Sequence, residues 1–88
     1  RAAAGRRAEL APLRKAMLAA EKLVEKLSHQ ISSCDAVLAD SNVYTRDPQK
    51  AQRAALERGQ LAKQLADAEE IWLNASHAFE EASDQPLV

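Results

Sequence analysis

The stretch LADSNVYTRDP, from Leu38 to Pro48, interrupts two long segments that carry the same helical spacing of apolar residues. Before it, apolar residues alternate at intervals of three and four from Leu10 onward without a miss. Such spacing predicts a coiled-coil seam, which is narrower than the apolar face of an ordinary core helix. The first seam consists of Leu10, Leu13, Met17, Ala20, Val24, Leu27, Ile31, Cys34 and Leu38.

The segment after the interruption has a clear helix start. Asp47 is a good N-cap residue, and Pro48 suits the first helical position, where its missing N–H costs nothing. Nine of the ten seam positions in this segment are apolar, and the exception is Arg58. Gly59 beside it costs about 1 kcal/mol relative to alanine in a helix interior, so this pair marks the weak point of the second helix. The second seam consists of Ala51, Ala54, Arg58, Leu61, Leu65, Ala68, Trp72, Ala75, Phe79 and Ala82.

The composition also favours helices. The 88 residues suit one small domain, and only two Gly and three Pro leave few turns for a sheet. A connection of eight or nine residues makes the two helices antiparallel neighbours. We therefore predict an all-α fold, an antiparallel two-helix coiled-coil hairpin. The expected segments are a flexible lead-in or linker end over 1–8, a helix over about 9–39, a turn over 40–47, a helix over about 48–83 and a tail over 84–88.

The distribution of charge fits this hairpin. Residues 1–30 carry seven Lys/Arg and three Glu, a net charge of +4, whereas residues 64–88 carry six Asp/Glu and no Lys or Arg, a net charge of −6. Antiparallel pairing places the basic start of the first helix beside the acidic end of the second. The same pairing brings Leu10 close to Phe79, so residue sizes and charges agree on the hairpin.

Both ends of the hairpin carry further expectations. At the turn, Val43 and Tyr44 are expected to fold inward and close the open end of the two-helix core. At the opposite end, Pro12 is expected in the first turn of the first helix, and the second helix is expected to stop before Pro86.

Apolar residues flank the seam on one side. In an antiparallel pair these positions of the two helices fall on the same side of the hairpin. They either thicken the seam or form an apolar shoulder that docks on another domain or supports weak self-association. The shoulder consists of Ala16, Leu23, Val37, Ile71 and Ala78.

The sequence carries no pattern for catalysis or for a metal site. No phosphate-binding glycine-rich loop is present, and the two Gly residues are 54 positions apart. His29 and His77 fall on the outer face, whereas Cys34 points into the seam, so the three are not expected to converge on a metal. A thiol in the seam also lacks the exposed, electropositive setting of a reactive cysteine. We expect this chain to be non-catalytic and to hold no cofactor.

The sequence also bears on cellular setting. Cys34 is the only cysteine, so no internal disulfide can form, and this usage fits a reducing cytoplasm. No apolar run approaches 18 residues, so no membrane-spanning helix is expected. The chain begins at Arg1 without an initiator Met, and we expect it to be a piece of a longer cytoplasmic protein.

Basic residues of the lead-in and of the outer face of the first helix form the candidate binding site. Lys15, Lys22 and His29 recur every seven residues and therefore share one outward face. Phosphate backbones are attracted to such a row of charges through counterion release. The alternative is an ordinary solvated face, and no aromatic residue interleaves with the basic residues in the sequence. We call the candidate set the basic stripe: Arg6, Arg7, Arg14, Lys15, Lys22 and Lys26.

Three quoted segments together resemble a known family. RRAELAPLRKAM (6–17) leads into the first helix, LADSNVYTRDPQKA (38–51) forms the turn, and LADAEEIWLNASHAFEEA (65–82) closes the hairpin. In this order they resemble the C-terminal coiled-coil domain of ABC-F ATPases, particularly the Uup-like members. The most distinctive parts are the turn, with an apolar–aromatic pair before Asp-Pro, and the late Trp72.

The resemblance implies a soluble cytoplasmic ATPase with two nucleotide-binding cassettes upstream, where ATP and Mg would bind. Members of this family are linked to ribosomes and translation, and the hairpin of Uup-like members is associated with DNA binding. The implied partners are therefore DNA or ribosomal RNA and the cassettes of the same chain.

Two other functions stay open at this point. The hairpin could be a protein-interaction or spacer element that positions the cassettes without touching nucleic acid. It could also be the tRNA-contacting helical arm of an aminoacyl-tRNA synthetase such as the valyl enzyme, although Asp47-Pro48 followed by Trp72 fits the ATPase pattern better.

Overall fold

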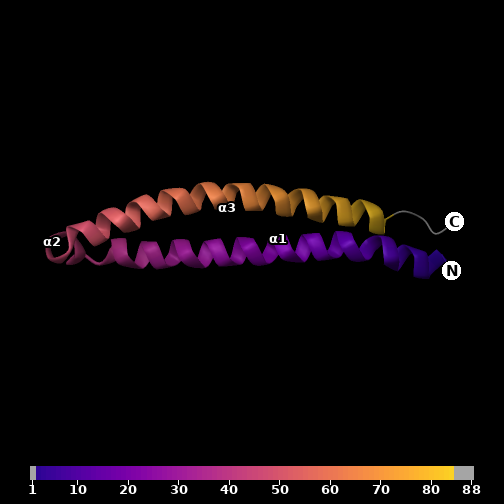
Figure 1. Cartoon of the computed structure of the whole chain (residues 1–88), viewed down its shortest axis with the longest axis horizontal. Coiled ribbons are helices and arrows are strands. Elements are labelled where there is room, and N and C mark those ends of the chain that lie inside the picture. The colour runs from indigo at the N-terminus through magenta and orange to yellow at the C-terminus, as the bar shows by residue number, and fades with distance from the viewer. Residues whose placement is uncertain (1, 85–88) are drawn as a thin grey trace.

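The chain folds into an extended helical hairpin about 61 Å long. A computed structural model describes residues 2–84 and contains α1 (Ala2–Ala39), the short α2 (Val43–Arg46) and α3 (Pro48–Ser83). Figure 1 shows α1 and α3 running side by side in opposite directions, with α2 at the far tip and the start of α1 beside the end of α3 at the other end. The prediction of an all-α antiparallel hairpin is confirmed.

The two predicted seams form the interface between α1 and α3. All nine residues of the first seam are buried or half-buried, and so are nine of the ten residues of the second. Short alanine side chains fill many of these positions, so the helices approach closely without a thick core. The buried residues are Ala20, Leu27, Cys34, Val43, Ala51, Ala54, Leu61 and Ala68.

The first helix begins earlier than predicted. Residues 2–8, expected as a flexible lead-in, belong to α1, and Pro12 therefore lies inside the helix instead of in its first turn. Pro12 has no N–H to donate to the carbonyl of Ala8, so one helical hydrogen bond is missing there. Two features offset this loss: alanine has the highest helix propensity, and Arg6 extends the seam spacing by one step before Leu10.

The tip is a compact turn in which backbone groups are paired locally. The backbone N–H of Asn42 donates to the side chain of Asp40 at 2.9 Å, which stabilises the exit from α1. The side chain of Asp47 accepts from the backbone N–H of Lys50 at 3.1 Å, and Pro48 follows it directly. Asp47 and Pro48 therefore start α3 as predicted.

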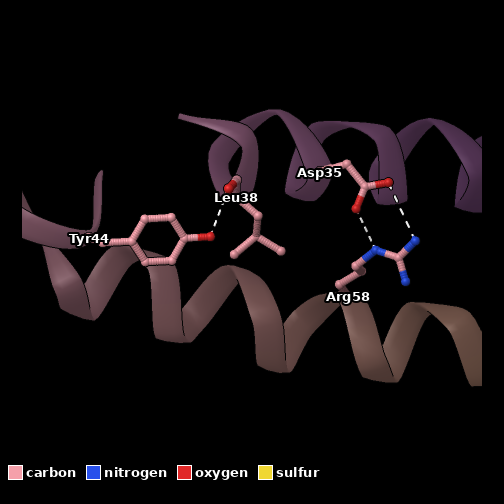
Figure 2. Close-up of polar contacts among 4 residues, drawn as sticks. All are labelled: Asp35, Leu38, Tyr44 and Arg58. Atoms are coloured by element: carbon pink, nitrogen blue, oxygen red, sulfur yellow. Dashed lines mark hydrogen bonds and ion pairs between the residues drawn. The ribbon is translucent and has the colours of Figure 1, made fainter. Parts of the chain in front are cut away.

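Only one of the two apolar tip residues folds inward. Val43 is buried at 6% exposure, as predicted, but Tyr44 is 53% exposed, and the prediction that its ring closes the core is wrong. Because residues 43–46 form the helical turn α2, neighbouring side chains point about 100° apart and cannot both face the core. The Tyr44 hydroxyl instead donates to the carbonyl oxygen of Leu38 at 2.7 Å (Figure 2).

The single charged seam residue is paired across the hairpin. Arg58 in α3 donates to both carboxylate oxygens of Asp35 in α1, from Nε to Oδ1 and from Nη2 to Oδ2 (Figure 2). Beside it, a Cβ atom added to Gly59 would meet no atom within 4 Å, so no close packing requires a glycine at this position. The helix continues through both residues without a break.

The apolar shoulder is divided between the two alternatives. Val37 and Ala78 are half-buried and widen the seam, whereas Leu23 and Ile71 remain 42% and 57% exposed. Ala16 is exposed as well. Within residues 2–84, no helix combines the length and the apolar character needed to cross a bilayer. The tail from residue 85 onward, including Pro86, lies outside the described residues.

Candidate nucleic-acid interface

Arg6 is separated from the rest of the basic stripe by its contacts. Its Nη2 atom donates to the carbonyl oxygens of Ala82 and Ser83 at 2.7 Å each, and the residue is half-buried. These carbonyls belong to the last turn of α3, where helical hydrogen bonds run out and the helix dipole is negative. Arg6 therefore caps the end of α3 and closes the open end of the hairpin.

Three further residues of the basic stripe surround an apolar patch on the outer face of α1. Arg14, Lys15 and Lys22 line a shallow depression together with the exposed Leu18. Two small residues, Ala11 and Ala19, complete its lining. This part of the basic stripe is thus a continuous surface whose floor is apolar and whose charged lining residues are all basic.

A second depression lies between the two helices near the open end. It is open to solvent, has a volume of about 310 Å³, and is lined by Arg7, Arg14, Leu10, Ala11 and Phe79. It shares Ala11 and Arg14 with the depression around Leu18, so the two are contiguous. An aromatic side chain from α3 therefore lies among the arginines of α1, which the order of residues along α1 does not reveal.

The remaining residues of the basic stripe are exposed and form no ion pair with the described part of the chain. Arg7, Arg14, Lys15, Lys22 and Lys26 are all exposed, and none forms an ion pair within 4.0 Å with another residue of the described part of the chain. Their charges are directed toward solvent. The acidic residues near the end of α3 are also exposed, so this end of α3 is negative whereas the first part of α1 has an excess of basic residues. These acidic residues are Asp67, Glu69, Glu70, Glu80 and Glu81.

A separate basic group lies at the tip and was not identified from the sequence. Lys50 and Arg53 line a depression beside Val37 and Glu57, and Arg46 is exposed nearby in the chain. Glu57 contributes a negative charge to this depression, in contrast to the two depressions along α1. The sequence of this segment predicts a turn and a helix start. Its basic residues follow no periodic spacing, so the sequence does not place them on one face.

The other candidate reactive groups do not form a site. Cys34 is buried at 5% exposure, as predicted, and burial raises the pKa of its thiol, with the nearby Glu57 and Asp35 raising it further. His29 and His77 are exposed, and His77 lies 3.2 Å from Glu81. Among residues 2–84, no three His, Cys, Asp or Glu side chains gather closely enough to hold a metal ion.

Comparison with known proteins adds no relative to this picture. No family model matches the chain, no curated protein matches it, and no solved structure matches it. The class that the fold defines is an extended all-helical hairpin.

Proposed function

We propose that this chain is the C-terminal coiled-coil hairpin of a soluble ABC-F ATPase and that it contacts nucleic acid, DNA or ribosomal RNA, through α1. The observation that carries the proposal is the row of five exposed basic residues on α1 that make no ion pair with the described part of the chain. The quoted turn and the late Trp72 support the choice of parent protein.

The dimensions of the row suit a nucleic-acid backbone. From Arg7 to Lys26 the helix advances about 28 Å at 1.5 Å per residue, a little less than the roughly 34 Å repeat of a DNA duplex. Each phosphate neutralised by a Lys or Arg releases condensed counterions, which is the main source of affinity independent of base sequence. A row of this length can therefore contact several phosphates along one groove.

The acidic end of α3 gives the hairpin a direction of approach. Glu69, Glu70 and Glu80 are exposed and repel a phosphate backbone from the outer face of α3. The same charges leave the outer face of α1 as the favourable side. Binding is therefore expected to be one-sided and strongly dependent on salt.

A second function is favoured by a different observation. Leu23 and Ile71 are large apolar residues of the shoulder that remain about half exposed. In a spacer or protein-interaction hairpin, this surface would dock on the ATPase cassettes, and the basic stripe would have no ligand. Substitutions in the shoulder would then affect the parent ATPase, whereas substitutions in the stripe would not.

Charge reversal tests the nucleic-acid proposal. A variant with Arg14→Glu, Lys15→Glu and Lys22→Glu is expected to bind labelled duplex DNA and structured RNA at least about tenfold more weakly at low salt, measured by fluorescence anisotropy. The matched control reverses three charges at the tip, Arg46→Glu with Lys50→Glu and Arg53→Glu.

The control variants separate the site from net charge. The tip variant changes the net charge by the same amount and should retain most of the affinity. Arg6→Gln should lower the melting temperature, because the last turn of α3 loses its cap, without weakening binding. Unchanged binding by the stripe variant, or a greater loss in the tip variant, contradicts the proposed interface.

A further inference from the structure

We infer that the depression between Arg7, Arg14 and Phe79 accepts the base of an unpaired nucleotide, so that the hairpin prefers single-stranded or locally opened nucleic acid to a continuous duplex. This inference rests on the proposed function and specifies its ligand. It starts from the depression in which the aromatic side chain of Phe79 lies beside two basic residues of α1.

The floor of the depression is formed by seam residues from both helices. Leu10 from α1 and Phe79 from α3 are half-buried, so each packs into the seam and still presents part of its surface to solvent. The volume of about 310 Å³ lies at the lower end of the roughly 300–1,000 Å³ typical of sites for small molecules. One flat, partly apolar group such as a nucleobase is of the right size for this space.

The charged lining suits the remainder of a nucleotide. Both basic residues that line the depression are arginines, whereas two of the three basic residues that line the neighbouring depression around Leu18 are lysines. A guanidinium group binds phosphate oxygens in pairs and also stacks on flat rings, which an ammonium group cannot do. Arg7 and Arg14 can therefore hold the phosphates on either side of a base that rests on Phe79.

The contiguous surface extends this contact to a strand. Because Ala11 and Arg14 belong to both depressions, a chain of nucleotides can pass from Phe79 along Lys15 and Lys22 without crossing an acidic lining residue. Bases inside a duplex are stacked on both faces, so their rings are not free to reach the phenyl group. Stacking on an aromatic side chain is tolerant of base identity and contributes about 1–3 kcal/mol per base when removed by substitution. The expected preference is therefore for unpaired strands of any sequence.

The test compares two aromatic positions of the same seam. Phe79→Leu keeps an apolar seam residue and removes the ring, and Trp72→Leu does the same one heptad away from the depression. Both variants are checked for helicity and melting temperature. Their affinities are then measured by anisotropy for 20-nucleotide single strands of deoxythymidine and of uridine, for a duplex of the same length, and for an abasic strand that keeps the phosphates.

The inference predicts a selective effect of the ring at position 79. Phe79→Leu should weaken binding of both single strands at least about fivefold and leave duplex and abasic-strand binding unchanged. Trp72→Leu should leave all four affinities unchanged. The unmodified chain should bind the abasic strand about as weakly as Phe79→Leu binds deoxythymidine.

Other outcomes overturn it, and they differ from failure of the proposed function. Equal loss for single strand and duplex, no loss in Phe79→Leu, or a preference of the unmodified chain for duplex overturns the inference while the basic stripe stands. In a further outcome, an acidic amphipathic peptide of equal charge displaces the single strands and loses as much affinity for Phe79→Leu as they do. That result assigns the depression to a peptide and overturns the inference as well. Insensitivity of all binding to charge reversal at Arg14, Lys15 and Lys22 removes the proposed function itself.

Discussion

Arg58 and Asp35 form a two-point hydrogen-bonded ion pair between α3 and α1, and this pair accounts for the only charged residue in the second seam. The second contact, from Nη2 to Oδ2, is 3.4 Å long. The hydrogen bond to the Asp35 carboxylate, together with the negative charge of that carboxylate, raises the pKa of the Arg58 guanidinium. The pair lies at a fixed level of the hairpin and therefore helps to set the register of the two helices.

The pair is expected to contribute little to the free energy of unfolding. The side chains of Arg58 and Asp35 are 44% and 49% exposed, and exposed pairs of this kind are worth about 0.2–1 kcal/mol. In a double-mutant cycle of Asp35→Ala and Arg58→Ala, we expect a coupling within this range in urea denaturation, decreasing with added salt. A coupling above about 2 kcal/mol would indicate a desolvated pair and contradict the geometry.

Gly59 should be replaceable with a gain in stability. The added methyl group of Gly59→Ala meets nothing within 4 Å, and alanine favours a helix interior by about 1 kcal/mol over glycine. We expect the free energy of unfolding to rise by about this amount. Gly5→Ala is the matched comparison, because its added methyl is equally free but lies near a helix end, where the gain should be smaller. Destabilisation by Gly59→Ala would show that the helix interior differs from this description.

The tip residues should differ in their contributions. Val43→Ala removes buried methyl groups and should lower the free energy of unfolding by about 1–2 kcal/mol. Tyr44→Phe leaves the exposed ring and removes only the hydrogen bond to Leu38, for which we expect about 0.5–1.5 kcal/mol. Thermal melting of the two variants, with Tyr44→Ala as a third, checks the ranking. A larger loss for Tyr44→Ala than for Val43→Ala would favour a buried ring.

The thiol of Cys34 should give stability a measurable dependence on high pH. Because its pKa is raised above the ordinary value of 9.0, the folded chain holds this proton more tightly than the unfolded chain. This contribution is complete below about pH 9 and is lost as the pH rises from there through the folded-state pKa. The stability difference between the unmodified chain and Cys34→Ala should therefore shrink as the pH rises above about 9.

Reactivity gives a second measurement of the same group. At pH 8 the folded chain should react with an aromatic disulfide reagent much more slowly than the chain unfolded in urea, because the thiolate is the reacting form and the sulfur is buried. Equal reaction rates in the folded and unfolded chain would place the thiol at the surface. The same conclusion would follow if the free energy of unfolding depended on pH identically in the unmodified chain and in Cys34→Ala.

The fold was predictable because the same three-and-four spacing continues through both helices. The seam residues between Leu10 and Leu38 share one face of α1, and those between Ala51 and Ala82 share one face of α3. Asp47 and Pro48 specify where α3 begins. The early start of α1 was not predicted because the only apolar residues in 2–8 are alanines. Alanines favour a helix but do not mark which face of it is buried. Tyr44 was misplaced because a four-residue helical turn leaves no periodic signal and separates it from Val43.

The candidate site was predictable only in part for a related reason. Lys15 and Lys22 share a heptad position, so their common face follows from the spacing alone. The capping contact of Arg6 and the position of Phe79 beside Arg7 depend on which residues of the second helix lie opposite, and hence on the register of the pair. The sequence predicted that Leu10 lies close to Phe79. That Phe79 also lies beside the arginines became clear only from the positions of the side chains in the structure.

The salt dependence of binding tests the central claim most directly. If all five exposed basic residues of α1 contact phosphates, the slope of log K against log salt for duplex DNA should approach −4.5, at about 0.9 per contact. The variant with Arg14→Glu, Lys15→Glu and Lys22→Glu should lose about 2.7 of that slope, whereas the tip variant should keep it. A slope near zero for the unmodified chain, or an equal slope in the stripe variant, would contradict nucleic-acid binding by this face.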